Sequence, residues 1–125
     1  HVTLPVHRKS PLSWFQVLPF RRLLERERPD IMHIRSRVPG WIAWLAWRGM
    51  NPTTRPNFVS TVHGFNSVNA YSRIMTRGEL VITVSESCRD FVLTNYPETD
   101  PGKIRVVHRG VDPAEYASDY QNPEE

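Results

Sequence analysis

Short runs of apolar, mostly β-branched residues alternate along the chain with longer stretches whose apolar positions recur at helical spacing. Four of the short runs predict strands, namely Ile31–Ile34, Phe58–Val62, Leu80–Val84 and Ile104–Val107. A fifth candidate, Val2–Val6, is weaker because Pro5 lies in it and proline cannot donate to a sheet. The interior runs are apolar on both faces, so we expect an α/β domain whose parallel sheet has helices on both faces.

Three longer stretches predict helices. Trp14–Arg28 has an apolar face, and its Arg- and Glu-rich end is expected to be exposed to solvent. Because Pro19 falls within it, this helix either kinks there or consists of two pieces, the second with Pro19 in its first turn. Pro39–Arg48 opens with proline and is followed by glycine, the usual punctuation of a helix. Glu86–Tyr96 is the third, with the preceding serine expected to cap its first turn.

The second of these helices carries three tryptophans. Trp41, Trp44 and Trp47 are spaced three residues apart, so they drift around the helix by about 60° per step and cannot all face one way. One interpretation buries them between the sheet and a neighbouring segment. The other exposes them as a belt that contacts a membrane surface or a lipid acceptor, which would make the protein peripheral to a membrane.

Length and composition indicate one domain in a reducing compartment. The chain has 125 residues, of which 39% are hydrophobic, enough for one domain with a core. Its single cysteine, Cys88, cannot form an internal disulfide, and no spaced cluster of ligands predicts a metal site. No apolar run is long enough to span a bilayer. The chain opens at His1 and closes on a polar run, so both ends are interpreted as cuts in a longer cytoplasmic protein.

Arginine dominates the positive charge. The net charge is +3, and of 16 basic residues only Lys9 and Lys103 are lysines. The planar guanidinium binds phosphate and carboxylate in bidentate fashion, which suits an anionic acceptor or a nucleotide diphosphate. The alternative is that the arginines are solvent-exposed surface residues that bind no ligand. The charge does not by itself indicate a nucleic-acid partner.

Polar residues follow the predicted strands at their carboxyl ends, where ligands bind in open parallel sheets. These are Arg35, Ser36 and Arg37 after the first strand, His63 and Gly64 after the second, Ser85 after the third, and His108, Arg109 and Gly110 after the fourth. If the strands are parallel, these groups share one rim, which would suit anionic or polyhydroxylated substrates. The dinucleotide fingerprint, the P-loop and the nucleophile elbow of hydrolases are all missing, which disfavours dehydrogenase, kinase and esterase functions.

Five segments together resemble a known family. They read RPDIMHIRSRVPGW, FVSTVHGFNS, YSRIM, LVITVSESCRDFV and KIRVVHRGVDPAEY. In this order and spacing they resemble the N-terminal domain of retaining glycosyltransferases of family four, and in particular the lipopolysaccharide-core or cell-envelope branch. The resemblance implies a partial N-terminal, Rossmann-like domain of a GT-B fold over residues 1–116, with residues 117–125 as a polar tail leading into the linker. The donor-binding second domain would lie beyond this chain.

The resemblance also implies roles for residues. His63 would lie near the donor sugar and the reacting centre and act in catalysis. The remaining positions would bind substrate, and they are Arg35, Ser36, Arg37, Gly64, Asn66, Tyr71, Arg73, Ser85 and Arg109. Arg109 departs from the family pattern, which usually has asparagine before Gly-Val-Asp, so it either contacts acceptor phosphate or holds the linker.

The sequence therefore predicts a glycosyltransferase that moves a sugar from a nucleotide-sugar donor to a glycolipid or saccharide acceptor, with retention and without a metal or other cofactor. As an isolated chain it is expected to be inactive, because fixed cations that stabilise the leaving diphosphate would lie on the second domain. The alternative function is a non-catalytic Rossmann-like module that binds an anionic glycolipid or a protein partner.

Overall fold

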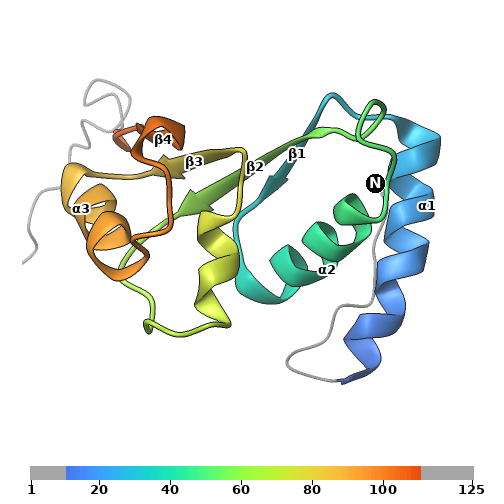
Figure 1. Cartoon of the computed structure of the whole chain (residues 1–125), viewed down its shortest axis with the longest axis horizontal. Helices are drawn as coiled ribbons and strands as arrows, with labels where there is room; N and C mark the ends of the chain where they lie inside the picture. The colour runs from blue at the N-terminus through green and yellow to red at the C-terminus, as the bar shows by residue number, and fades with distance from the viewer. Residues whose placement is uncertain (1–10, 111–125) are drawn as a thin grey trace, which may run out of the picture.

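The computed structural model describes residues 11–110, which form a four-stranded parallel sheet with a layer of helices on one face (Figure 1). The strands are β1 (Ile31–Ile34), β2 (Asn57–Val62), β3 (Leu80–Thr83) and β4 (Ile104–Val106). They lie side by side in the order of the sequence, and every neighbouring pair is parallel. The four predicted strands and the α/β class are thereby confirmed, with strand ends that move by at most one residue. The candidate strand Val2–Val6 and the tail 117–125 lie outside the described residues.

The first helical stretch consists of two pieces. A 3-10 turn, η1 (Pro11–Gln16), leads into α1 (Val17–Glu27), whose first turn contains Pro19. Proline is tolerated there because the first N–H groups of a helix have no intrahelical acceptor. Arg28 then ends the helix with φ 46°, and its backbone N–H donates to the Leu24 carbonyl at 2.9 Å. Of the two predicted alternatives, the structure therefore has the two pieces and not the single kinked helix.

The other helices differ from expectation only at their ends. α2 (Arg37–Arg48) begins two residues earlier than predicted, because the extended Ser36 serves as its N-cap and Pro39 falls inside its first turn. α3 (Glu86–Asn95) begins after Ser85, whose hydroxyl accepts from the Cys88 N–H at 3.1 Å, as expected of a capping serine. Two further 3-10 turns, η2 (Ser72–Thr76) and η3 (Pro101–Lys103), were not anticipated.

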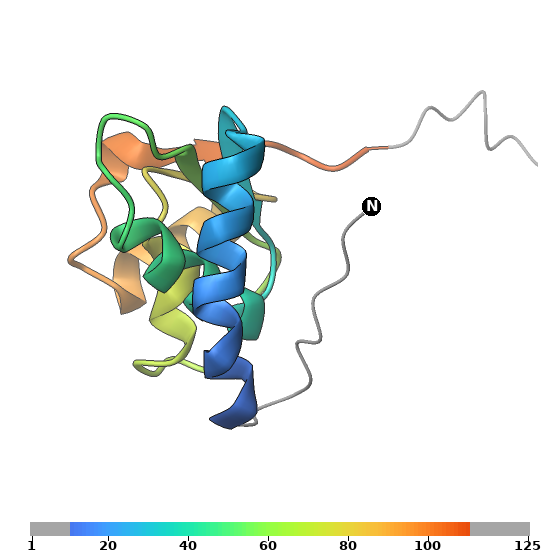
Figure 2. The same cartoon turned by 90° about the vertical axis from the view of Figure 1, so that its right-hand side faces the viewer.

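The connections between strands all lie on one face of the sheet. Each step from β1 to β4 moves to the next strand in the same direction, so right-handed crossovers bring α2, η2 and α3 to the same side. α1 packs beside α2, as Figure 2 also shows. The core between the layers includes Phe58 and Val81 from the sheet and Val92 from α3, each fully buried. The expectation of helices on both faces is not met within residues 11–110, where the helices pack on this one side and Ile31 on the other face is 60% exposed.

The tryptophans of α2 point in different directions and each has a packing partner. Trp47 is buried against Phe58, with ring centroids 5.4 Å apart. Trp41 donates its Nε1 proton to the Tyr71 carbonyl at 2.9 Å. The half-buried Trp44 lies between the guanidinium groups of Arg48 and Arg77, each 4.8 Å from its centroid. These contacts favour the packed interpretation over an exposed belt.

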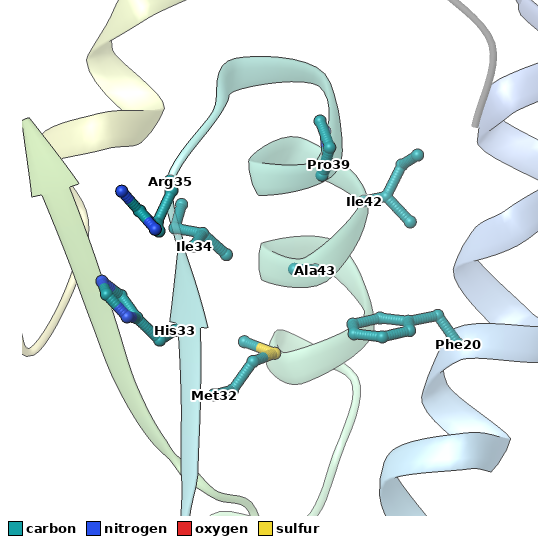
Figure 3. Close-up of a pocket in the computed structure, with 8 residues that line it drawn as sticks. All are labelled: Phe20, Met32, His33, Ile34, Arg35, Pro39, Ile42 and Ala43. Atoms are coloured by element: carbon teal, nitrogen blue, oxygen red, sulfur yellow. The ribbon is translucent and has the colours of Figure 1, made fainter. Parts of the chain in front are cut away.

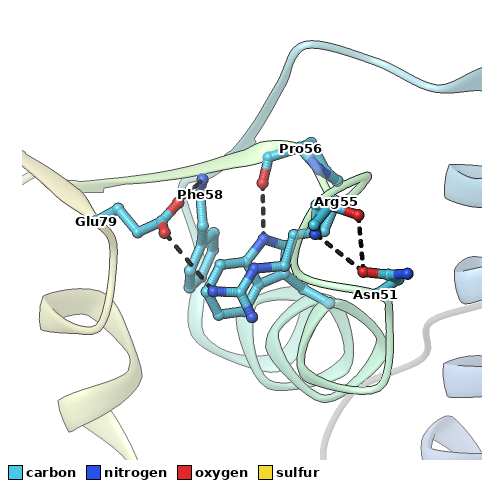
Figure 4. Close-up of polar contacts among 7 residues, drawn as sticks. Asn51, Arg55, Pro56, Phe58 and Glu79 are labelled. Carbon is cyan, nitrogen blue, oxygen red and sulfur yellow. Dashed lines mark hydrogen bonds and ion pairs between the residues drawn. The ribbon is translucent and has the colours of Figure 1, made fainter.

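A polar cluster fixes the beginning of β2, at the end of the sheet opposite the predicted rim (Figure 4). Trp47 Nε1 donates to the Pro56 carbonyl at 2.7 Å, and the Arg55 guanidinium covers the Trp47 ring at 3.5 Å from its centroid. The carboxylate of Glu79 accepts from the Phe58 N–H at 2.9 Å and lies 3.8 Å from Arg55. Because both β2 and its neighbour β3 are held here, the register that positions His63 at the other end is held as well.

Candidate functional site

His63 lies between two arginines at the carboxyl ends of the strands. Arg35, which follows β1, donates its Nε proton toward His63 Nε2 at 3.2 Å. Arg109, which follows β4, brings its Nη2 against His63 Nδ1 on the opposite side of the ring. Residues separated in the sequence by 28 and 46 positions meet here because parallel strands end at one edge of the sheet. The predicted rim is confirmed in its position.

The two contacts to His63 compete for one acceptor. A neutral imidazole has one acceptor nitrogen and one N–H, whereas a guanidinium only donates. The ring can therefore accept from Arg35 or from Arg109, and its remaining N–H then faces the other donor. Burial lowers the pKa of His63 below its usual value, and the positive charges of Arg109, Arg35 and His33 lower it further, in that order.

A cavity of about 430 Å³ opens beside this cluster. Of the predicted site residues, six line it: Arg35, Ser36, Arg37, His63, Gly64 and Asn66. Three others were missed by the sequence analysis: Thr61, Phe65 and Met75. Thr61 was hidden inside a strand, where its hydroxyl forms a hydrogen bond with His33 Nε2 at 2.6 Å. The only available signal was the period-two alternation of β1 and β2, which places His33 and Thr61 on one face.

Packing does not demand a glycine at position 64. A Cβ added to Gly64 would meet no atom within 4 Å, and its φ is not positive. The absence of a side chain leaves the backbone accessible from the cavity, so this position is suited to the close approach of a ligand.

Four predicted site residues are engaged elsewhere. Arg37 lines the cavity, but its Nη1 donates to Ser72 Oγ at 3.1 Å and its guanidinium lies 5.3 Å from the ring centroid of Tyr71. Arg73 forms an ion pair with Glu98 at 2.9 Å, and the Ser85 hydroxyl caps α3. Tyr71, Arg73, Ser85 and Arg109 are not among the residues that line the cavity, although Arg109 contacts His63, which does line it. Their proposed roles in substrate binding stay predictions, since each has a structural partner already.

The cavity is basic. Among the described residues, Arg35 and Arg37, which line the cavity, and Arg109, which contacts His63 beside it, have no acidic side chain within ion-pair distance, whereas five other arginines do. Over residues 11–110, no group of His, Cys, Asp and Glu is arranged to hold a metal ion. No helix in that range has the length and apolar character of a membrane span. A guanidinium without a carboxylate attracts anions, so the cavity is suited to a negatively charged ligand.

A smaller, apolar hollow of about 180 Å³ lies on the other side of β1 (Figure 3). Its walls are mainly Phe20 from α1, Met32 and Ile34 from β1, and Pro39, Ile42 and Ala43 from α2. Figure 3 shows Met32 and Ile34 on the α2 side of β1, with His33 and Arg35 pointing away from it toward β2. The alternation of the strand thus gives the hollow its apolar walls, while His33 and Arg35 also border it and Arg35 lines the basic cavity as well.

Comparison with known proteins identifies the family to which the chain belongs. Residues 1–115 match the family model described as Glycosyltransferase Family 4. No match was found among curated proteins. The chain is similar to the crystal structure of a glycosyltransferase from Rickettsia africae ESF-5, with 28% sequence identity and a TM-score of 0.73. The similarity covers 99% of this chain but 33% of that one. The family match extends over far more than half of the chain, and the chain therefore belongs to glycosyltransferase family 4.

Proposed function

We propose that this chain is the acceptor-side domain of a GT-B glycosyltransferase that transfers a sugar from a nucleotide-sugar donor to a cell-envelope glycolipid or saccharide, with retention. Membership of the family supports the transferase activity. The length of the Rickettsia protein, about three times the matched part, is compatible with a second domain that binds the donor. In this proposal the enzyme acts in the cytoplasm, at the cytoplasmic face of the membrane.

The observation that carries this proposal is the position of His63. It lies at the carboxyl ends of the strands, beside a basic cavity, and burial, followed by the charges of Arg109 and Arg35, lowers its pKa and so favours the neutral imidazole. A neutral imidazole can accept a hydrogen bond from a sugar hydroxyl through one nitrogen and donate through the other, so it can orient a donor sugar without carrying charge.

The reaction breaks the bond between the sugar and the diphosphate and forms a bond to the acceptor oxygen on the same face of the sugar. As the diphosphate leaves, the acceptor hydroxyl passes its proton to an oxygen of that diphosphate. Positive charge develops on the sugar and negative charge on the leaving group. A neutral His63 avoids repelling the positive sugar, whereas fixed cations offset the charge of the diphosphate. The chemistry requires no metal ion in this proposal.

The test uses a longer protein that contains this chain and its donor-binding domain. Release of nucleotide diphosphate would be measured with a panel of nucleotide sugars and an envelope glycolipid acceptor. We expect His63→Gln to lower kcat by about tenfold or more, equivalent to ~1.4 kcal/mol of transition-state stabilisation. Arg22→Gln, at an exposed position of α1, is the matched control and is expected to leave kcat unchanged.

Two results would contradict the proposal. Normal turnover by a well-folded His63→Gln variant would make the histidine structural. Binding of the glycolipid without diphosphate release from any nucleotide sugar would favour the non-catalytic binding module instead. The 125-residue chain alone is expected to release none, because it presents one wall of the cleft.

A further inference from the structure

The cluster around His63 contains more hydrogen-bond donors than acceptors. Arg35 and Arg109 approach the two ring nitrogens from opposite sides, and only one of these contacts can be a hydrogen bond while the ring is neutral. Neither guanidinium has a carboxylate partner within residues 11–110. An oxyanion between them would satisfy both arginines at once.

We propose that Arg35 and Arg109 form a subsite for one phosphate group of the acceptor sugar, with His63 as the third donor to the same group. This inference rests on the proposed function, since it names the chemical class of the acceptor. A phosphate monoester fits because it offers three acceptor oxygens, which can receive bonds from two guanidinium groups and an imidazole N–H.

Arg37 does not belong to this subsite, although the sequence pairs it with Arg35. Its guanidinium is held by the Ser72 hydroxyl at 3.1 Å and by the face of Tyr71, so it links α2 to the segment that precedes β3. Arg109, which follows β4 at the opposite edge of the sheet from β1, contacts His63 instead. The phosphate would then lie at the His63 end of the cavity.

The rest of the cavity is suited to a sugar. Its volume of about 430 Å³ falls in the range of small-molecule sites. Ser36 and Asn66 line it and can bond to hydroxyl groups, while the open backbone at Gly64 allows close approach. A phosphorylated hexose combines the anionic and polyhydroxylated character that these walls require.

Phosphate binding should be coupled to protonation of His63. The charged or titratable groups that face the imidazole are Arg35, Arg109 and His33, and together with burial they disfavour its cationic form. A bound dianion opposes these positive charges, so the pKa of His63 rises when the subsite is filled. The neutral ring that the transfer step uses donates to the phosphate through its one N–H.

Binding of glucose 6-phosphate to the 125-residue chain tests the subsite directly. By isothermal titration calorimetry, Arg35→Gln and Arg109→Gln should each raise the Kd for glucose 6-phosphate by about tenfold or more, as expected for the loss of charge-assisted bonds. Arg109→Lys should recover part of the loss because it keeps the charge without the fork. Arg22→Gln should bind like the wild type, and neutral glucose should bind far more weakly. Thermal melts of each variant would confirm that the fold is intact.

NMR gives a second readout that a merely structural role would not move. The titration midpoint of the His63 ring, assigned by comparison with His63→Gln, should rise when glucose 6-phosphate is added. In Arg109→Gln, addition of the same concentration of glucose 6-phosphate should not change the midpoint. An unchanged midpoint at saturation, or unchanged affinity in both glutamine variants, would overturn the proposal. Tighter binding of uridine diphosphate than of glucose 6-phosphate, dependent on the same two arginines, would assign the subsite to the donor and overturn it too.

The outcomes separate this inference from the proposed function. Arginine-dependent binding of glucose 6-phosphate with no turnover in the longer protein would defeat the proposed function while the subsite stands. Turnover with an acceptor KM that Arg109→Gln leaves unchanged would defeat the subsite while the transferase stands.

Discussion

Glu79 is expected to be a main determinant of stability at the beginning of β2. Its carboxylate accepts from the Phe58 N–H at 2.9 Å, and the Phe58 residue is fully buried. Glu79→Ala removes this acceptor, and no neighbouring side chain takes its place. Glu79→Gln keeps an oxygen of nearly the same geometry and is therefore the matched control.

The magnitude follows from what each variant leaves behind. An N–H deprived of its partner at a buried site costs about 1–3 kcal/mol. The Arg55–Glu79 ion pair is longer, at 3.8 Å, and the Glu79 side chain is 47% exposed, so its loss adds ~0–1 kcal/mol. We expect the alanine variant to lose both contributions and the glutamine variant only the second.

Urea denaturation followed by tryptophan fluorescence would measure the difference, since Trp47 packs against Phe58. Equal free energies of unfolding for the alanine and glutamine variants would refute the reasoning. In that case water, and not Glu79, satisfies the Phe58 N–H.

Three further predictions follow from other contacts. Gly78→Ala should destabilise the protein by about 1–3 kcal/mol in the same denaturation assay, because its Cβ would lie 2.5 Å from the Leu80 carbonyl and 2.9 Å from the Ser60 nitrogen. Gly64→Ala, which meets nothing, should unfold like the wild type, and equal stability of the two variants would contradict this packing. The pKa of His63 is lower in the folded chain than its ordinary value of 6.5, so the unfolded chain binds more protons as the pH falls through this value. The free energy of unfolding should therefore decrease below pH 6.5. His63→Gln should flatten that slope, whereas an unchanged slope would locate the effect in other groups. Cys88 is buried, its Sγ donates a hydrogen bond to the Val62 carbonyl at 3.4 Å, and burial raises the pKa of its thiol. It should therefore react with a thiol reagent only after urea unfolds the chain. Rapid labelling of the native chain would contradict this prediction.

The elements and the location of the site were accessible from the sequence. Strands of β-branched residues and helices with proline and glycine at their ends are encoded by local sterics, which act over a few residues. Once the strands are taken as parallel, their carboxyl ends must share an edge, so Arg35, His63 and Arg109 could be brought to one rim before any contact was known.

The partners of individual side chains were decided by the tertiary structure. Nothing near Arg37 or Arg73 in the sequence indicates that Ser72 and Glu98 hold them, because those partners lie 35 and 25 positions away. The same holds for Thr61, which reads as a strand residue yet lines the cavity.

The pattern of the chain by itself determined an α/β domain with a basic rim at one edge of the sheet, because strand alternation and helix punctuation are local properties. Only the packed structure decided which of the arginines face His63 and which hold the scaffold. That choice depends on strand order and on the crossing of α2 over the sheet, which place side chains from distant segments within hydrogen-bond distance.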